Sequence, residues 1–145
     1  MTAESAAIEI LLVDDSLADV RLTLEVLKGA KVRNHLHVAM DAEEAMALLT
    51  GAGERKIPLP DLILLDIDLP RRDGRELLDE IKQDDRLRHI PVVILTTSQA
   101  KMDVMRSYQL RANAFITKPV DVDQFFRVIK RIEPFWLEVV TLSRP

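Results

Sequence analysis

Three apolar runs in this chain each stop at charged side chains, and this pattern constrains the fold more than any other feature. The run ILLV precedes Asp14 and Asp15, LILL precedes Asp66, and AFIT precedes Lys118. Such a run is typical of a buried strand that ends at a loop. In an open parallel α/β sheet the carboxyl ends of the strands share one edge, where ligands bind. We therefore expect three carboxylates and one ammonium group to meet there.

Strand and helix patterns alternate five times along the chain. Strands are expected over 8–13, 36–40, 62–65, 92–96 and 114–117, with a helix after each. This alternation predicts an α/β fold, a doubly wound five-stranded parallel sheet flanked by five helices. The 145 residues are expected to form a single domain over 1–145, with a core of about 8–132 and an apolar C-terminal extension over 133–145.

Helix boundaries and faces are also visible in the sequence. Four apolar residues recur at helical spacing and are expected to face the core from the first helix: Leu17, Val20, Leu24 and Leu27. Gly29 is a plausible stop for that helix. Asp41 is expected to cap the second helix, with Glu44 at the capping-box offset, and Asp121 to cap the fifth.

Composition excludes several classes of protein. The net charge of −4 argues against non-specific binding to nucleic acid. The absence of cysteine excludes disulfides and thiolate sites. No apolar run approaches the length of a membrane span, and the first residues do not form a secretory signal, so we expect a cytoplasmic protein without a membrane partner.

The predicted carboxylate cluster suggests phosphoryl chemistry. Two carboxylates ~4 Å apart repel by about 4 kcal/mol at an effective dielectric constant of 20, so three must protonate or bind a cation. Hard oxygen ligands suit Mg²⁺, and the metal leaves one carboxylate able to attack phosphorus. Lys118 can supply a positive charge to the transferred group and Thr96 a hydroxyl donor. Each feature alone also fits a helix cap, a solvated loop or a turn; their conjunction at successive strand ends favours the site.

These motifs resemble the receiver domains of two-component response regulators. The resemblance rests on LLVDDS, LILLDIDLPRRDG, PVVILTTS and AFITKPV, and it covers nearly the whole chain. It implies a flavodoxin-like fold with strand order 2-1-3-4-5. By position, Asp66 is the phosphoacceptor, and Mg²⁺ is bound by Asp14, Asp15, Asp66 and the backbone carbonyl of Asp68.

The same resemblance implies a switch. Thr96 and Lys118 contact the phosphoryl group, and Phe115 occupies the aromatic switch position. Movement of Thr96 toward the phosphoryl group lets Phe115 turn, which changes the surface of the fourth helix, fifth strand and fifth helix. The protein is thereby expected to be a phosphoacceptor that assists its own phosphorylation and dephosphorylation rather than a conventional enzyme.

The implied partners are a sensor histidine kinase, an unknown downstream target and a second copy of the chain. The sequence is similar to the stand-alone regulators of phytochrome-type kinases. A homodimer is expected through the fifth helix and the apolar tail, with the following interface: Phe126, Ile129, Phe135, Trp136, Val139 and Val140. The alternative is that the tail folds back on its own domain.

Two other functions are compatible with parts of the same pattern, that of a phosphatase and that of a pseudo-receiver. The Asp-x-Asp of LILLDID also occurs in haloacid-dehalogenase-like phosphatases, but there it precedes the other acidic residues, whereas here the acidic pair comes first. A pseudo-receiver that binds partners without phosphorylation is disfavoured by the intact motifs. His35 and His37 share one strand face without an evident third ligand, so we expect them to be surface residues.

Overall fold

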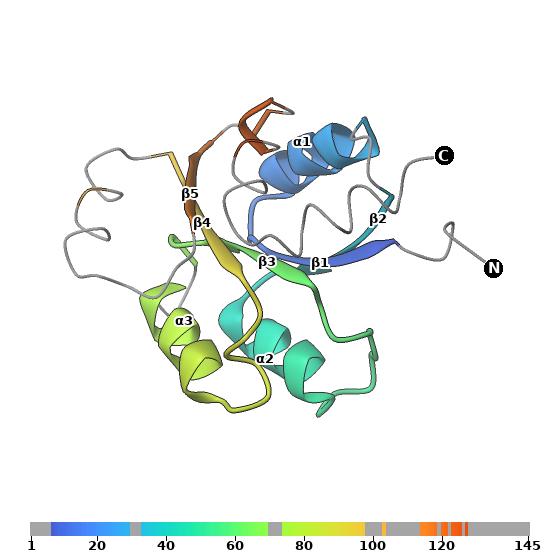
Figure 1. Cartoon of the computed structure of the whole chain (residues 1–145), viewed down its shortest axis with the longest axis vertical. Helices are drawn as coiled ribbons and strands as arrows, with labels where there is room; N and C mark the ends of the chain where they lie inside the picture. The colour runs from blue at the N-terminus through green and yellow to red at the C-terminus, as the bar shows by residue number, and fades with distance from the viewer. Residues whose placement is uncertain are drawn as a thin grey trace.

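Five parallel strands form one sheet at the centre of the protein (Figure 1). The structure, a computed structural model, describes residues 7–29, 33–69, 74–97, 103, 114–118, 120–121, 123–125 and 127. The strands are β1 (Ile8–Val13), β2 (Asn34–Ala39), β3 (Leu62–Asp66), β4 (Val92–Thr96) and β5 (Ala114–Thr117). Their order is β2-β1-β3-β4-β5, and every neighbouring pair is parallel. The predicted sheet is therefore confirmed, although β2 begins two residues earlier than expected.

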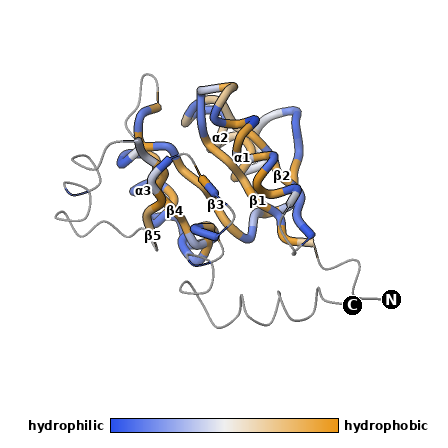
Figure 2. The backbone as a smooth tube through the Cα atoms, turned by 90° about the horizontal axis from the view of Figure 1, so that it is seen from above, coloured by the Kyte–Doolittle hydropathy of each residue, from blue (hydrophilic) through white to orange (hydrophobic). Residues whose placement is uncertain are grey.

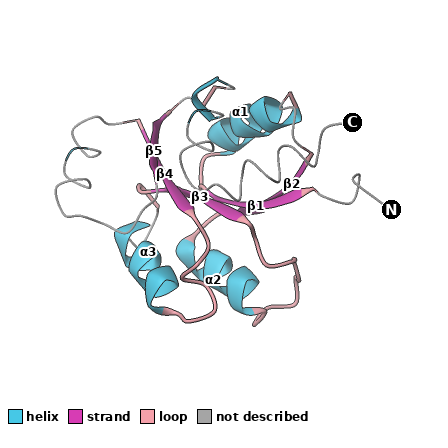
Figure 3. Cartoon of the chain, viewed as in Figure 1, coloured by secondary structure: helices cyan, strands magenta, loops and turns pink. Residues whose placement is uncertain are grey.

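Helices cover both faces of the sheet. Helix α1 (Leu17–Lys28) lies on one face, and α2 (Ala42–Thr50) and α3 (Gly74–Gln83) lie on the other (Figures 1 and 3). Side chains of β3 alternate between the two layers, with Leu64 in the α1 layer and Leu65 in the α2/α3 layer. Strands β3 and β4 are buried at every position, as expected for central parallel strands covered on both sides. In Figure 2, which colours the backbone by hydropathy, these strands are mostly hydrophobic.

The described helices begin and end where capping chemistry allows it. The Asp41 carboxylate accepts from the Glu44 N–H at 2.8 Å, so the predicted cap is confirmed. The Glu44 carboxylate returns to the Met40 N–H, one residue before the N–H that a standard capping box uses. Gly51 ends α2 with a φ of 77°, a conformation that glycine adopts without steric cost. Asp121 accepts from the Gln124 N–H at 2.8 Å, as expected of a helix cap.

The apolar face of α1 differs from the prediction at its first turn. Leu27 is buried and Val20 packs against the same cluster, but the Leu17 side chain is 63% exposed. Leu17 lies in the turn next to the carboxyl edge of the sheet, where the strands end and provide no surface to cover it. Thr23 is buried instead, so the helix packs through a stripe that begins one turn later than the sequence suggested.

Some predicted elements fall on residues that the structure does not describe. These are the fourth helix, apart from residue 103, and most of the fifth helix. The same is true of the proposed dimer interface: Phe126, Ile129, Phe135, Trp136, Val139 and Val140. Among the described helices, none is both long and apolar enough to cross a membrane.

Candidate functional site

Three carboxylates gather at the carboxyl edge of the sheet. Asp14 follows the last residue of β1, Asp15 comes next, and Asp66 is the last residue of β3. One oxygen from each lies within 4.8 Å of the others. Asp14 and Asp66 are buried, whereas Asp15 is exposed and opens the group to solvent. The structure thus brings together the three aspartates that the strand-end pattern placed at one edge.

The two buried aspartates are oriented in the same way. One oxygen of Asp14, Oδ1, accepts a hydrogen bond from the Ser16 N–H at 3.0 Å. The corresponding oxygen of Asp66 accepts from the Asp68 N–H, also at 3.0 Å. Each bond spans two residues along the loop that follows the strand, as in an Asx-turn. The backbone therefore fixes one oxygen of each carboxylate and leaves Oδ2 directed at the centre of the site.

The Lys118 ammonium group occupies that centre. Its Nζ lies 2.8 Å from Asp14 Oδ2, 3.1 Å from Asp66 Oδ2 and 2.9 Å from Asp19 Oδ2. The side chain is only 7% exposed, and its backbone N–H donates to the Thr96 carbonyl at 2.9 Å. An ammonium group has three donors, so each one meets a different carboxylate. The β4 and β5 ends together aim this lysine at the acidic group.

Burial and opposite charge act against each other on the pKa values of Lys118 and Asp14. Burial alone would lower the pKa of the Lys118 ammonium, but hydrogen bonds with Asp14 and Asp19 and the charge of Asp66 raise it above its usual value. For Asp14 the balance differs. Burial raises the pKa of its carboxyl, and the hydrogen bonds from Lys118 and Ser16 compensate only in part, because the Asp66 charge adds to the rise. By formal charge, three carboxylates face one ammonium group, and folding disfavours the charged form of Asp14.

The remaining predicted residues surround this centre. Thr96 is fully buried at the end of β4. Phe115 lies beside Ile94 in the sheet register and packs, half-buried, against the core layer of α2 and α3. Asp68 is exposed and contributes its N–H to the orientation of Asp66. Their predicted roles toward a phosphoryl group stay predictions.

Gly74 is required by a close approach of two backbones next to Asp66. A Cβ atom at this position would lie 2.8 Å from the Ile67 Cα and 3.0 Å from the Asp66 carbonyl oxygen. The Gly74 N–H donates to the Ile67 carbonyl at 3.3 Å. Helix α3 therefore begins directly against the loop that carries the acceptor candidate, which only glycine permits.

Two polar contacts were missed by sequence reasoning. Asp19 reaches Lys118 from the first turn of α1; its signal was the Ser16-x-x-Asp19 spacing of a helix start. Glu9 lies between the two histidines of β2, with Oε2 2.8 Å from His35 Nδ1 and Oε1 2.7 Å from His37 Nε2. The prediction of a surface residue is confirmed for His35, which is exposed, but is wrong for His37, which is half-buried; both histidines pair with Glu9, a group that the sequence did not reveal.

The strand order defines a flavodoxin-like α/β protein, with an acidic cluster beside a buried lysine at the carboxyl edge of its sheet. The family model of the response regulator receiver domain matches residues 10–130. Response regulator Rcp1 of Synechocystis sp. (strain ATCC 27184 / PCC 6803 / Kazusa) is 50% identical over 134 residues, which cover 92% of this chain and 91% of Rcp1. The chain belongs to the response regulator receiver domain family.

Solved structures agree with this assignment. The bacteriophytochrome response regulator AtBRR superposes with a TM-score of 0.80 at 43% identity, covering 87% of this chain and 92% of that one. The phosphorylated cyanobacterial phytochrome response regulator RcpA gives a TM-score of 0.73 at 46% identity, covering 90% and 94%. The Mn²⁺-bound form of Rcp1 gives 0.70 at 48% identity, covering 90% and 95%. The most similar relatives thus include regulators named for phytochromes.

Proposed function

We propose that this receiver accepts a phosphoryl group on Asp66 from a phosphohistidine of a sensor histidine kinase. The Asp66 carboxylate attacks phosphorus, a P–O bond forms, and the P–N bond breaks. The imidazole leaves with the bonding electrons and takes up a proton. The observation that carries the proposal is the orientation of Asp66. One oxygen is held by the Asp68 N–H, and the other lies 3.1 Å from a buried ammonium that can neutralise the incoming charge.

A divalent cation fits the donor set of this site. Asp14, Asp15 and Asp66 offer three hard oxygen ligands within 4.8 Å of one another, and Mg²⁺ prefers such ligands together with phosphate oxygens. The bound Mn²⁺ of the relative Rcp1 supports the assignment. These three side chains, with the Asp68 carbonyl, are our proposed Mg²⁺ ligands. When bound, the ion supplies positive charge to the carboxylates and to the phosphoryl oxygens.

Phosphorylation then acts as a switch. An acyl phosphate brings about −1.5 to −2 charges and three acceptor oxygens to the end of β3. Lys118 and the Thr96 hydroxyl are the donors that we assign to those oxygens. Phe115, one strand further along the sheet, is the residue that we expect to respond, so the surface near β5 carries the signal to a downstream target.

The proposed kinase is of the phytochrome type. The support is the similarity to AtBRR and RcpA, whose names link them to phytochromes. We further propose that the chain acts as a stand-alone regulator and dimerises through its fifth helix and apolar tail. Removing the residues after Ile132 should leave phosphorylation intact and yield a monomer in sedimentation. The expected cytoplasmic location stays a prediction.

Phosphotransfer profiling tests the proposal directly. The purified protein is mixed with a panel of autophosphorylated histidine kinases, with and without Mg²⁺, and transfer of the label is followed at short times. We expect fast, Mg²⁺-dependent labelling by a phytochrome-type kinase and none of Asp66→Asn. Labelling by no kinase and no small phosphodonor would refute the acceptor function. Multiple-turnover hydrolysis of a phosphate monoester would instead favour the phosphatase reading.

A further inference from the structure

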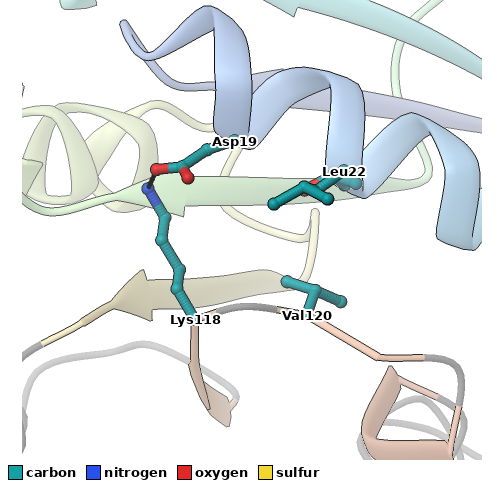
Figure 4. Close-up of a pocket in the computed structure, with 5 residues that line it drawn as sticks. Asp19, Leu22, Lys118 and Val120 are labelled. Atoms are coloured by element: carbon teal, nitrogen blue, oxygen red, sulfur yellow. Dashed lines mark hydrogen bonds and ion pairs between the residues drawn. The ribbon is translucent and has the colours of Figure 1, made fainter.

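Asp19 is the third carboxylate partner of Lys118, and it differs from the other two. Asp14 follows β1, Asp66 is the last residue of β3, and both belong to the proposed metal site. Asp19 comes from the first turn of α1 and lies outside that group. Its carboxylate lies 2.9 Å from Nζ, in direct contact with the ammonium group (Figure 4). Asp19 and Lys118 line a small pocket together with Leu22, Thr23 and Val120.

The backbone around Asp19 fixes its position. Ser16 caps α1, and its side-chain oxygen accepts from the Asp19 N–H at 3.3 Å. A carboxylate in the first turn is also favoured by the positive end of the helix dipole. The side chain is 34% exposed, so Asp19 pays a smaller desolvation cost than Asp14 or Asp66. Lys118 thus has one carboxylate partner that is anchored in a helix and is less buried than the other two.

The other two partners become unavailable when the proposed reaction proceeds. A divalent cation takes up carboxylate oxygens of Asp14 and Asp66, and phosphorylation converts Asp66 into an acyl phosphate. A buried ammonium that loses its carboxylates is strongly disfavoured. Lys118 is only 7% exposed, and of its three carboxylate partners only Asp19 keeps both oxygens free of the metal ion and of the phosphoryl group. The phosphoryl oxygens then join Asp19 as acceptors for the ammonium group.

We propose that Asp19 is a positioning residue that retains the Lys118 ammonium at the site while Asp14 and Asp66 engage the metal ion and the phosphoryl group. Asp19 touches neither. It acts through the lysine, whose ammonium group it holds at 2.9 Å and keeps directed at the end of β3. This inference rests on the proposed phosphoacceptor function and assigns one more residue to it.

The test compares Asp19→Asn, Asp19→Glu and a matched control, Glu25→Gln. Glu25 lies on the same helix, is exposed, and pairs only weakly with Lys28 at 3.7 Å. Glu25→Gln also removes one negative charge, which makes it a matched control for Asp19→Asn. Mg²⁺ affinity is measured by calorimetry, the ¹⁵N signal of the Lys118 ammonium by NMR with and without Mg²⁺, and phosphorylation by acetyl phosphate at saturating Mg²⁺. Thermal unfolding verifies that each variant folds.

For Asp19→Asn we expect Mg²⁺ affinity and phosphorylation rate to fall by about five- to tenfold. A larger effect is not expected, because Asp19 is partly exposed and solvent weakens its ion pair with Lys118. The Lys118 ammonium signal should remain in Mg²⁺-loaded wild type and be lost by exchange with water in Mg²⁺-loaded Asp19→Asn. Asp19→Glu should restore most of each property, and Glu25→Gln should match wild type.

Two results would overturn the inference. The first is an Asp19→Asn protein whose ammonium signal persists with Mg²⁺; the second is a phosphorylation rate equal to that of Glu25→Gln. Failure of the proposed function has a different signature, because wild type itself would then not be phosphorylated. In that case the NMR and calorimetric comparisons still decide whether Asp19 holds the lysine as Mg²⁺ binds.

Discussion

Two ionic clusters of this protein lie on one sheet and have opposite arrangements, because one places a cation among carboxylates and the other places a carboxylate between two histidines. At the carboxyl ends of the strands, one ammonium group, Lys118, is surrounded by three carboxylates and is almost completely buried. At the β1/β2 edge, one carboxylate, Glu9, lies between two imidazoles, and His35 is 58% exposed. The first cluster holds surplus negative charge away from water, whereas the second holds a single carboxylate with partners on both sides.

The difference shows which cluster is arranged for stability and which for function. The partners of Glu9 lower its pKa against the opposing effect of burial, so folding favours its ionised form. Burial and the neighbouring Asp66 raise the pKa of Asp14, so folding disfavours its ionised form. A buried charge surplus costs stability unless a ligand neutralises it, which is typical of functional sites. The strand-end cluster therefore lacks a positively charged ligand that would neutralise its excess negative charge, so structural stability alone does not explain it.

The largest effect should follow loss of the single cation. Lys118→Met leaves three carboxylates without a buried partner, and we expect the free energy of unfolding to fall by about 3 kcal/mol at neutral pH. Chemical denaturation measures it. Mg²⁺ should recover part of the loss, because it supplies the missing positive charge. Lys28→Met removes an exposed lysine and should change stability little; equal losses in the two variants would break the comparison.

A smaller loss is expected where backbones meet beside the strand-end cluster. Gly74→Ala places a methyl group 2.8 Å from the Ile67 Cα, and we expect a loss of about 2 kcal/mol in thermal unfolding together with slower phosphorylation. Gly53→Ala is the control, since its methyl group would meet only the Ala47 Cβ at an ordinary 3.6 Å. A Gly74→Ala protein as stable as Gly53→Ala would show that the α3 start tolerates displacement.

Removing one of the surplus charges should have the opposite sign. Asp14→Asn keeps the oxygen that accepts from the Ser16 N–H but loses the one that accepts from Lys118, which still has Asp19 and Asp66 as partners. Because one surplus negative charge is removed, we expect the metal-free protein to gain on the order of 1 kcal/mol. An acid whose pKa is raised on folding loses stability as pH rises through its folded pKa, so the gain should shrink in acid. Unfolding curves from neutral to acid pH check this. Mg²⁺ should stabilise wild type more than the variant; a destabilised metal-free variant would contradict the charge surplus.

The edge cluster should respond to pH in the reverse direction. The pKa of Glu9 is lowered on folding, so its contribution is present above the unfolded pKa and is lost as pH falls through the folded value. Glu9→Gln should therefore cost about 1 kcal/mol at neutral pH, and the difference from wild type should narrow in acid. Phosphorylation should be unchanged. A cost that persists at the lowest pH would mean that packing, rather than charge, explains the effect.

Sequence reasoning succeeded where local pattern and sheet topology suffice. The apolar runs before Asp14, Asp66 and Lys118 form strands of the sheet, as expected. Continuous apolar runs are typical of parallel strands that are buried on both faces. The Asp41 cap was equally visible, since its partners lie three residues apart. These features depend on neighbours in sequence or on a topology that the alternation of elements already fixes.

Sequence reasoning missed the contacts that depend on how helices and strands are placed relative to one another. Asp19 meets Lys118 only because the start of α1 lies over the end of β5, a distance of 99 residues along the chain. Glu9 meets His35 because the β1/β2 register makes them direct neighbours, which hydropathy does not reveal. Leu17 has the spacing of a core residue but lies beyond the ends of the strands. In each case the missing information was the position of one element along another.

The central claim, that the strand-end cluster serves to place a phosphoryl group on Asp66, is tested most directly by locating that group. The protein is phosphorylated, the acyl phosphate is reduced with borohydride, and mass spectrometry finds the aspartate that has become homoserine. We predict conversion of Asp66, dependent on Mg²⁺ and absent from Asp66→Asn. Conversion of Asp14, Asp15 or Asp19 in the wild-type protein, with Asp66 intact, would contradict the account.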